Sequence, residues 1–146
     1  MHITYKGDYA LKAILDLAQH YGDPPVSIPD LAKRSDVPLK FLEQILLDLK
    51  RSGFVQSRRG KIGGYLLAKK PSEIKLGDVV RFIDGPIEPI ACVDKKYKAC
   101  RDIDRCVFRA IWQRVSEQTE KTIDSITFED LAKKKKKLSG VFTYQI

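Results

Sequence analysis

Residues 27–68 constrain the fold most, because they hold two short helical patterns that are separated by only a few residues. Ser27 can cap the first helix, and Pro29 suits its first turn. Pro38 opens the second helix, and Gly53 marks its end. Two short helices joined by a tight turn predict a helix-turn-helix. The apolar stripe that we expect the second helix to bury consists of Leu39, Leu42, Ile45, Leu46 and Leu49.

A glycine-rich basic loop follows this second helix. Residues 58–64 read Arg-Arg-Gly-Lys-Ile-Gly-Gly, and strand-like residues flank them at 54–57 and 65–68. This arrangement predicts a β-hairpin wing, whose glycines let the backbone turn sharply and approach a phosphate. The predicted fold class is therefore mainly α with a small β-hairpin, in the form of a winged helix-turn-helix.

Helical patterns also lie on both sides of this motif. Residues 4–21 predict an amphipathic helix, and residues 71–83 predict a shorter helical region. A long helix starts at Val107, and its apolar side chains exceed what one small domain needs, which indicates a dimerisation helix. A last helix, capped by Thr127, is expected to end in the lysine run at residues 133–137.

These patterns divide the chain into three parts. Residues 1–84 form the predicted winged helix-turn-helix DNA-binding domain, and residues 85–106 form a loop that carries the cysteines. Residues 107–146 form the dimerisation helix and a C-terminal helix and tail. The sequence shows no apolar leader and no run of about 18 apolar residues, so we expect a cytoplasmic protein that does not enter a membrane.

The positive charge is concentrated in one informative segment. The net charge is +8, of which the lysine run at residues 133–137 contributes five. Such a run is usually a solvated helix end, so it is a poor signal for DNA binding. Between Asp48 and Glu73, in contrast, there is no acidic residue. The basic residues of this acid-free segment, which suit contact with phosphates, are Lys50, Arg51, Arg58, Arg59, Lys61, Lys69 and Lys70.

The second helix of a helix-turn-helix enters the major groove of DNA and reads base edges with its N-terminal residues. Glutamate can accept from cytosine, glutamine can bind adenine through two hydrogen bonds, and an aromatic ring can contact a thymine methyl group. The basic wing would hold phosphates or enter the minor groove, and the alternative is a hairpin used for solubility or protein contacts. The candidate DNA-binding residues are Lys40, Phe41, Glu43, Gln44, Arg51, Arg58, Arg59 and Lys61.

The three cysteines are Cys92, Cys100 and Cys106. An odd number argues against a closed disulfide framework, and the spacing does not match the paired C-x2-C pattern of structural zinc sites. Iron–sulfur clusters tolerate more varied spacing, and the basic neighbours would offset the charge of a cluster. Spacing alone leaves two alternatives open, a shared cluster or three scattered thiols of which one or two are simply buried.

An enzymatic function has little support in the residues. The chain has no nucleotide-binding glycine motif and no plausible catalytic pairing of histidine with a carboxylate. An iron–sulfur electron carrier would leave the acid-free basic segment unexplained. We therefore expect a non-enzymatic protein whose partner is double-stranded DNA.

Several motifs in order resemble a known family of winged-helix regulators that includes IscR, NsrR and CymR. The resemblance starts at Thr4-x-Lys6-Gly7-x-Tyr9-Ala10 and runs to Ile126-Thr127, which is nearly the whole chain. Its most specific parts are Phe41-Leu-Glu-Gln-Ile-Leu, the wing Arg59-Gly60-x-x-Gly63-Gly64-Tyr65, and Leu76-Gly-Asp-Val with Asp84 behind it.

The resemblance implies a homodimer that binds a pseudo-palindromic operator and usually represses transcription. In the cluster-binding branch of the family, three cysteines at these places hold a [2Fe–2S] or [4Fe–4S] cluster, which would make Cys92, Cys100 and Cys106 its ligands. The cluster would sense redox state, nitric oxide or iron–sulfur status.

The fourth ligand departs from part of the family. Members with a histidine ligand carry it three residues after the last cysteine, where this chain has Arg109, which cannot ligate iron. Nitric-oxide-sensing members use an acidic residue from the first helix of the partner subunit, and Asp8 matches that position. The other role for Asp8 is a solvated acid near the N-terminus of its helix.

Two alternatives remain within regulation. The thiols could act directly, by forming a disulfide or binding another metal, in a regulator without a cluster. The chain could also be controlled by a partner enzyme, as relatives in cysteine metabolism are, although those relatives need no cysteine cluster.

Overall fold

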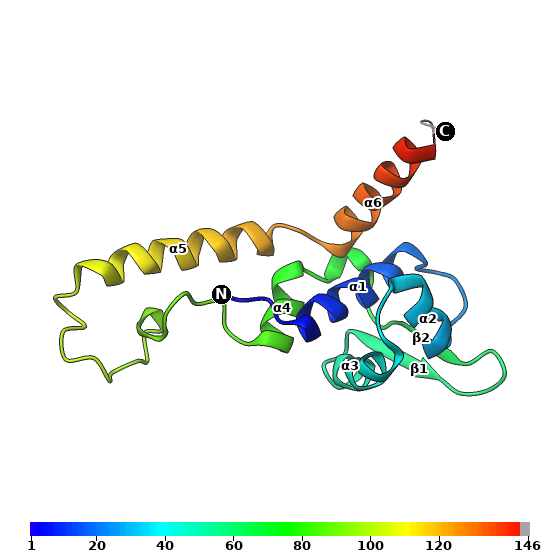
Figure 1. Cartoon of the computed structure of the whole chain (residues 1–146), viewed down its shortest axis with the longest axis horizontal. Helices are drawn as coiled ribbons and strands as arrows, with labels where there is room; N and C mark the ends of the chain where they lie inside the picture. Colours follow the sequence, from blue (N-terminus) through cyan, green and yellow to red (C-terminus); the bar gives the residue numbers. More distant parts are fainter. Residues whose placement is uncertain (144–146) are drawn as a thin grey trace.

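The computed structural model describes residues 1–143, so the last three residues of the predicted C-terminal tail lie outside the described part. The described residues fold into six α-helices, two short 3-10 helices (Pro71–Glu73 and Ala91–Val93) and one two-stranded antiparallel hairpin, which confirms a mainly α fold (Figure 1). The elements are α1 (Tyr5–Gln19), α2 (Ile28–Ser35), α3 (Leu39–Arg51), β1 (Val55–Arg58), β2 (Gly64–Leu67), α4 (Leu76–Asp84), α5 (Val107–Asp124) and α6 (Phe128–Thr143).

Local sequence explains how the helix-turn-helix begins and ends. The Ser27 hydroxyl accepts a hydrogen bond from the Asp30 amide at 3.3 Å and caps α2, as predicted. Asp36 ends α2 in the left-handed conformation, with φ 55°, which turns the chain towards α3. Pro38 stands directly before α3 and supplies no side-chain cap. The predicted helix-turn-helix is therefore present, formed by α2 and α3.

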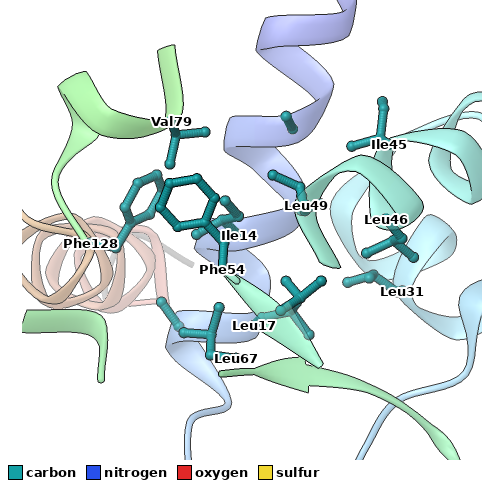
Figure 2. Packing of buried hydrophobic residues seen from close by; sticks show 14 of the residues in the cluster. Ile14, Leu17, Leu31, Ile45, Leu46, Leu49, Phe54, Leu67, Val79 and Phe128 are labelled. Carbon is teal, nitrogen blue, oxygen red and sulfur yellow. The ribbon is translucent and has the colours of Figure 1, made fainter. Parts of the chain in front are cut away.

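One core cluster holds the N-terminal domain together. Ile14 and Leu17 of α1 lie among side chains from α3, the hairpin, α4 and α6 (Figure 2). Of the predicted apolar stripe of α3, four residues are buried, but Leu39 is 45% exposed, so that part of the prediction was wrong. Leu39 is the first residue of α3, and it precedes the part of the helix that packs on α1 and α2.

The hairpin confirms the predicted wing, with strand limits that differ by about one residue. Val55 pairs with Leu67 at its base, and Arg58 pairs with Gly64 next to the turn. Tyr65 also exchanges two backbone hydrogen bonds with Val26, at 2.8 and 3.0 Å. Gly64 has φ 149° and no room for a Cβ atom, because the Val26 carbonyl lies against it. The hairpin is thereby fixed to the segment that precedes α2.

The last helix belongs to the N-terminal domain at its start and leaves it afterwards. Thr127 and Asp130 exchange hydrogen bonds between side chain and backbone at 3.0 and 3.2 Å, which confirms the predicted cap. Phe128 is 1% exposed within the core, although the sequence division grouped α6 with the dimerisation segment. The helix continues past the lysine run at residues 133–137 to Thr143, so the expectation that it ends there was wrong.

Residues 85–124 form an arm that extends from the N-terminal domain, with α5 as its long element (Figure 1). A bidentate ion pair between Arg81 of α4 and Asp124 of α5, at 2.8 and 2.7 Å, fixes the near end of α5 to the domain. Asp124 also lies against Gly77, where no Cβ atom would fit. No helix among the described residues has both the length and the apolar character needed to cross a membrane.

Candidate DNA-binding surface and cysteine loop

The predicted base-reading residues share the exposed face of α3. Lys40, Phe41, Glu43 and Gln44 are all exposed in the first two turns of the helix, while Leu42 between them is fully buried. This alternation follows from helical geometry, because the buried stripe fixes which side chains face outwards. The structure therefore brings these four side chains to one surface.

The predicted phosphate-contacting residues lie on the hairpin and at the end of α3. Arg58, Arg59 and Lys61 are exposed around the turn, which Gly60 makes possible with φ 114°. At the end of α3, the Arg51 side chain is 75% exposed. The hairpin is connected to α3 by a 2.7 Å hydrogen bond in which the Lys50 amino group donates to the Ser57 hydroxyl. This bond helps to hold the basic hairpin beside α3.

Aromatic residues of α1 extend the surface beyond the predicted set. The ring centroids of Tyr9 and Phe41 lie 5.8 Å apart, and those of Tyr5 and Tyr9 lie 6.3 Å apart. With Lys6 and Lys40 they line much of a groove of about 460 Å³ between α1 and α3. The sequence analysis missed this contribution of α1, although the four-residue spacing of Tyr5 and Tyr9 was a signal that both rings share one face.

Asp48 connects α1 to two of the predicted DNA-binding side chains. Its carboxylate lies 2.7 Å from the Lys6 amino group and 3.7 Å from the Arg51 guanidinium, and it accepts a 3.2 Å hydrogen bond from Gln44 Nε2. The hydrogen bond from Lys6 is the largest cause that lowers the pKa of Asp48 below its ordinary value. Asp48 is 17% exposed and was not among the predicted site residues.

The three cysteines lie on the predicted loop, and all are free thiols. Cys92 and Cys106 are half-buried, whereas Cys100 is exposed. Cys106 is the residue directly before α5, and Arg109 in the first turn of α5 donates a 2.9 Å hydrogen bond to the Cys92 carbonyl. Arg109 occupies the position at which the sequence analysis expected a histidine ligand in some relatives, and here it binds the backbone of the loop.

In the part of the chain that the structure describes, no three His, Cys, Asp or Glu side chains lie close enough together to hold a metal ion. Arg109 connects the start of the loop to the first turn of α5, and therefore holds the Cys92 backbone near the helix that Cys106 precedes. Cys100 lies between Cys92 and Cys106 in the sequence, on a stretch with no helix or strand. Within the described residues of one subunit, the three cysteine side chains therefore do not form the predicted group of cluster ligands.

Asp8 lies in the first turn of α1 and is about half exposed. Its carboxylate pairs with Lys12 one turn later, at 2.9 Å. The hydrogen bond from Lys12 to Asp8 raises the pKa of the lysine. Within its own subunit Asp8 is therefore a half-exposed helix acid that pairs with Lys12.

The N-terminus of α1 is attached to the residue just before the cysteine loop. The Asp84 carboxylate accepts hydrogen bonds from the Thr4 amide, at 3.1 Å, and from the Thr4 hydroxyl. It also lies so close to Gly7 that a Cβ atom there would collide with it. Two motifs that the sequence analysis quoted separately, Thr4-x-x-Gly7 and Asp84, thus form one contact.

Comparisons with known proteins agree with this structure. A family model described as Rrf2, iron-dependent transcriptional regulator, matches residues 3–134. An rrf2-like HTH-type transcriptional regulator of Rhodobacter capsulatus is 43% identical over 136 residues, which cover 88% of this chain and 91% of that protein. The HTH-type transcriptional regulator IscR of Yersinia enterocolitica is 37% identical over 131 residues, which cover 90% and 79%.

Two solved structures are similar over most of their length. CymR, the global cysteine regulator of B. subtilis, aligns with a TM-score of 0.76 at 32% identity, over 91% of this chain and 97% of that one. IscR of T. potens aligns with a TM-score of 0.73 at 34% identity, over 92% and 88%. These relatives are transcriptional regulators, a class of DNA-binding proteins that are not enzymes. The chain therefore belongs to the Rrf2 family of transcriptional regulators.

Proposed function

We propose that the chain is a homodimeric repressor that binds a pseudo-palindromic double-stranded operator in the cytoplasm under the control of an iron–sulfur cluster. The observation that carries this proposal is the position of the three free thiols. They lie between Asp84, which holds the N-terminus of α1, and α5, which exposes its apolar side chains. The sensor loop is thus next to both the DNA-binding domain and the proposed dimer contact.

Operator binding would use α3 in the major groove. Glu43 and Gln44 offer an acceptor for cytosine and a paired donor and acceptor for adenine, while Lys40 and Phe41 lie beside them. The exposed cations of the wing would contact phosphates or the minor groove, and Arg51 would bind the backbone from the end of α3. The acid-free segment supports this role, because it keeps repulsive carboxylates away from the phosphates.

Dimerisation would use the exposed apolar face of α5. These side chains are 39–74% exposed, and an isolated chain would leave them in water. A second copy of α5 would cover them and place two recognition helices about one helical turn of DNA apart. The exposed residues of this face are Val107, Phe108, Ile111, Trp112 and Val115.

The donor chemistry of the loop fits an iron–sulfur cluster. Cys92, Cys100 and Cys106 are free, and the stretch between Asp94 and Cys106 has no regular helix or strand that would stop it from closing. Asp8 of the partner subunit would be the fourth ligand. A cluster held there would supply a redox-active centre.

Contacts within the chain would couple a rearrangement of the loop to the position of α3 in the DNA-binding surface. Asp84 directly precedes the loop and holds Thr4, and the first turn of α1 is joined to α3 by the ion pair between Lys6 and Asp48. A shift of residues 85–106 therefore has a continuous route of hydrogen bonds and ion pairs to α3. A small rotation of either recognition helix would weaken binding to properly spaced half-sites.

The test begins with protein purified without oxygen, with absorption and EPR spectra and assays of iron and sulfide. We expect a cluster in the wild type and its loss in Cys106→Ala. Colourless protein without iron after anaerobic reconstitution would contradict the cluster and leave operator binding to be measured separately.

The role of Asp8 needs its own pair of variants. Asp8→Ala should shorten the lifetime of the cluster and alter cluster-dependent operator affinity. Glu129→Ala is the matched control, because Glu129 is also a first-turn acid that pairs with a lysine four residues later, at 3.8 Å. Unchanged cluster lifetime and operator affinity in Asp8→Ala would contradict the partner-ligand role.

A second candidate is a regulator of the same fold without a cluster, controlled by its thiols or by a partner protein. Two observations favour it. One similar structure is the oxidized form of Staphylococcus aureus CymR, with a TM-score of 0.71 at 28% identity, and the described residues of this chain hold no three-ligand group. Operator binding that responds to oxidation in iron-free protein, and is insensitive to oxidation in Cys106→Ala, would support this candidate.

A further inference from the structure

Asp48 is an acidic residue in the last turns of α3, beside side chains that the proposed function places on DNA. It lies one turn after Gln44 and one turn before Arg51, and its carboxylate contacts both. A carboxylate close to phosphates opposes binding, so its presence calls for another role. Its contacts with two candidate DNA-binding residues indicate what that role is.

The hydrogen bond from Gln44 to Asp48 sets the orientation of the Gln44 carboxamide. Gln44 Nε2 donates to Asp48 Oδ1 at 3.2 Å, which leaves its second N–H and its carbonyl oxygen free. Paired recognition of adenine requires one N–H and one carbonyl oxygen presented in a fixed order. A carboxamide without a second partner can rotate and present the reverse order, whereas one held by Asp48 cannot do so without losing this bond.

Asp48 is held in turn from α1. Lys6 approaches its other oxygen at 2.7 Å, and Arg51 lies at 3.7 Å from the oxygen that accepts from Gln44. The two cations offset the charge that would otherwise repel DNA. Lys6 also keeps the pKa of Asp48 low, so the carboxylate remains an acceptor at neutral pH. The carboxylate is thus charged, largely covered and fixed in place.

We propose that Asp48 is a positioning residue for base recognition: it holds the Gln44 carboxamide in one orientation, and Lys6 of α1 holds Asp48. The inference rests on the proposed reading of operator bases by α3. It adds a specificity-determining residue that itself contacts no base, and it makes α1 a part of the reading apparatus.

The experiment starts from an operator that the wild-type dimer selects from randomised double-stranded DNA. Fluorescence anisotropy then measures affinity for this operator and for each single-base variant of one half-site. Gln44→Ala should lose discrimination on the order of 10-fold at one base pair, the size expected for a paired contact. Asp48→Ala should lose about 5-fold or more at the same base pair, and the double variant should lose no more than Gln44→Ala alone.

Two further variants separate positioning from charge. Asp48→Asn keeps an oxygen that can accept from Gln44, and should retain most of the discrimination. Asp30→Ala removes an exposed carboxylate from the first turn of α2, and should change affinity for all DNA variants alike. Lys6→Met keeps both Gln44 and Asp48 and should lose discrimination by a smaller factor than Asp48→Ala. This variant keeps the proposal testable if Asp48→Ala does not fold. Thermal unfolding of each variant identifies losses that come from instability.

The outcomes are distinguishable. Equal changes in affinity for every DNA sequence in Asp48→Ala, or a loss of discrimination at other base pairs, would overturn the positioning role. Full discrimination in Gln44→Ala would also overturn it and leave operator binding intact. A wild-type protein that selects no operator at all would overturn both the positioning role and the proposed function.

Discussion

The N-terminal domain and the arm at residues 85–124 differ in where their apolar side chains lie. The domain buries side chains from α1, α3, the hairpin, α4 and the first turn of α6 in one cluster. The arm buries only Ile87 and Ser116 among its residues, all of which are described, and the Ser116 hydroxyl donates to the Ile87 carbonyl at 2.8 Å. The domain therefore packs around an apolar core of its own, whereas α5 leaves apolar side chains exposed, which the proposed second subunit would cover.

Polar contacts lie at both ends of the arm. Arg81 and Asp124 fix one end of α5 to α4, and Asp84 fixes the start of the loop to Thr4. Apolar packing stabilises the domain, and a small number of oriented contacts set the direction of the arm. Polar contacts of this kind can rearrange at lower cost than a close-packed core, which suits a regulated connection.

The largest expected effect tests whether the start of α6 belongs to the domain. Phe128→Ala removes a side chain that is 1% exposed and should lower the free energy of unfolding by about 3–5 kcal/mol. Urea denaturation followed by far-ultraviolet circular dichroism measures this. Ile90→Ala is the control in the arm, because its side chain is 47% exposed and lies outside the proposed dimer face, and it should cost less than about 0.5 kcal/mol. Equal losses would contradict the contrast between the two regions.

The next effect tests the proposed dimer surface. Ile111→Glu places a charge on the exposed apolar face of α5 and should convert the dimer to monomer in sedimentation experiments. Operator affinity should fall on the order of 100-fold, because a monomer contacts one half-site only. Gln118→Glu adds the same charge at an exposed polar position of α5 and should leave the dimer intact. A dimer that persists in Ile111→Glu would place the interface elsewhere.

A smaller effect is expected at the contact between α1 and the loop. Gly7→Ala puts a Cβ atom into the Asp84 carboxylate, which must then move away from Thr4. The net loss should be about 1–2 kcal/mol, because overpacking outweighs the gain in helix propensity. Gly140→Ala, which meets no atom within 4 Å, should cause no loss of stability. Urea denaturation measures both, and equal behaviour would show that Asp84 adapts without cost.

The smallest effect concerns the ion pair that fixes α5. The hydrogen bonds from Arg81 hold the pKa of Asp124 below its ordinary value, so the stabilisation is present above the unfolded-state pKa of about 3.9. It is lost as the pH falls through the lowered folded-state pKa. Asp124→Asn should therefore cost about 0.5–1 kcal/mol at neutral pH, a value reduced by solvent screening, and should equal the wild type in strong acid.

Glu129→Gln is the control for this titration. Its exposed pair with Lys133 at 3.8 Å should contribute little at any pH. Urea denaturation across the acid range measures both variants. A constant difference between Asp124→Asn and the wild type at every pH would show that the loss has a cause other than the charge of Asp124.

Most of the fold could be predicted from the sequence because its signals are local. The caps at Ser27 and Thr127, the glycines of the wing and the spacing of the α3 stripe each act within one or two turns of the chain. The two errors in the helices also had local causes. Leu39 fits the helical spacing but lies before the packed part of α3, and lysines do not prevent a helix from continuing to Thr143.

The candidate site could be predicted only in part. Helical periodicity identified the exposed residues of α3, and composition identified the basic wing and the cysteine loop. The contribution of Tyr5, Lys6 and Asp48 depends on how α1 packs against α3, which no local pattern reveals. The sequence likewise showed that Arg109 stands where a histidine ligand was expected. Its hydrogen bond to the Cys92 carbonyl, however, could be found only in the folded structure.

The sequence by itself determined the type and order of the elements, the exposed face of α3 and the separation of the thiols from the DNA-binding motif. The tertiary structure alone decided which distant groups meet. Thr4 binds Asp84 across 80 positions of the chain, and Arg81 binds Asp124 across 43. The physical reason is that capping and periodicity depend on neighbouring residues, whereas an ion pair between helices depends on the packing that brings their side chains within hydrogen-bond distance.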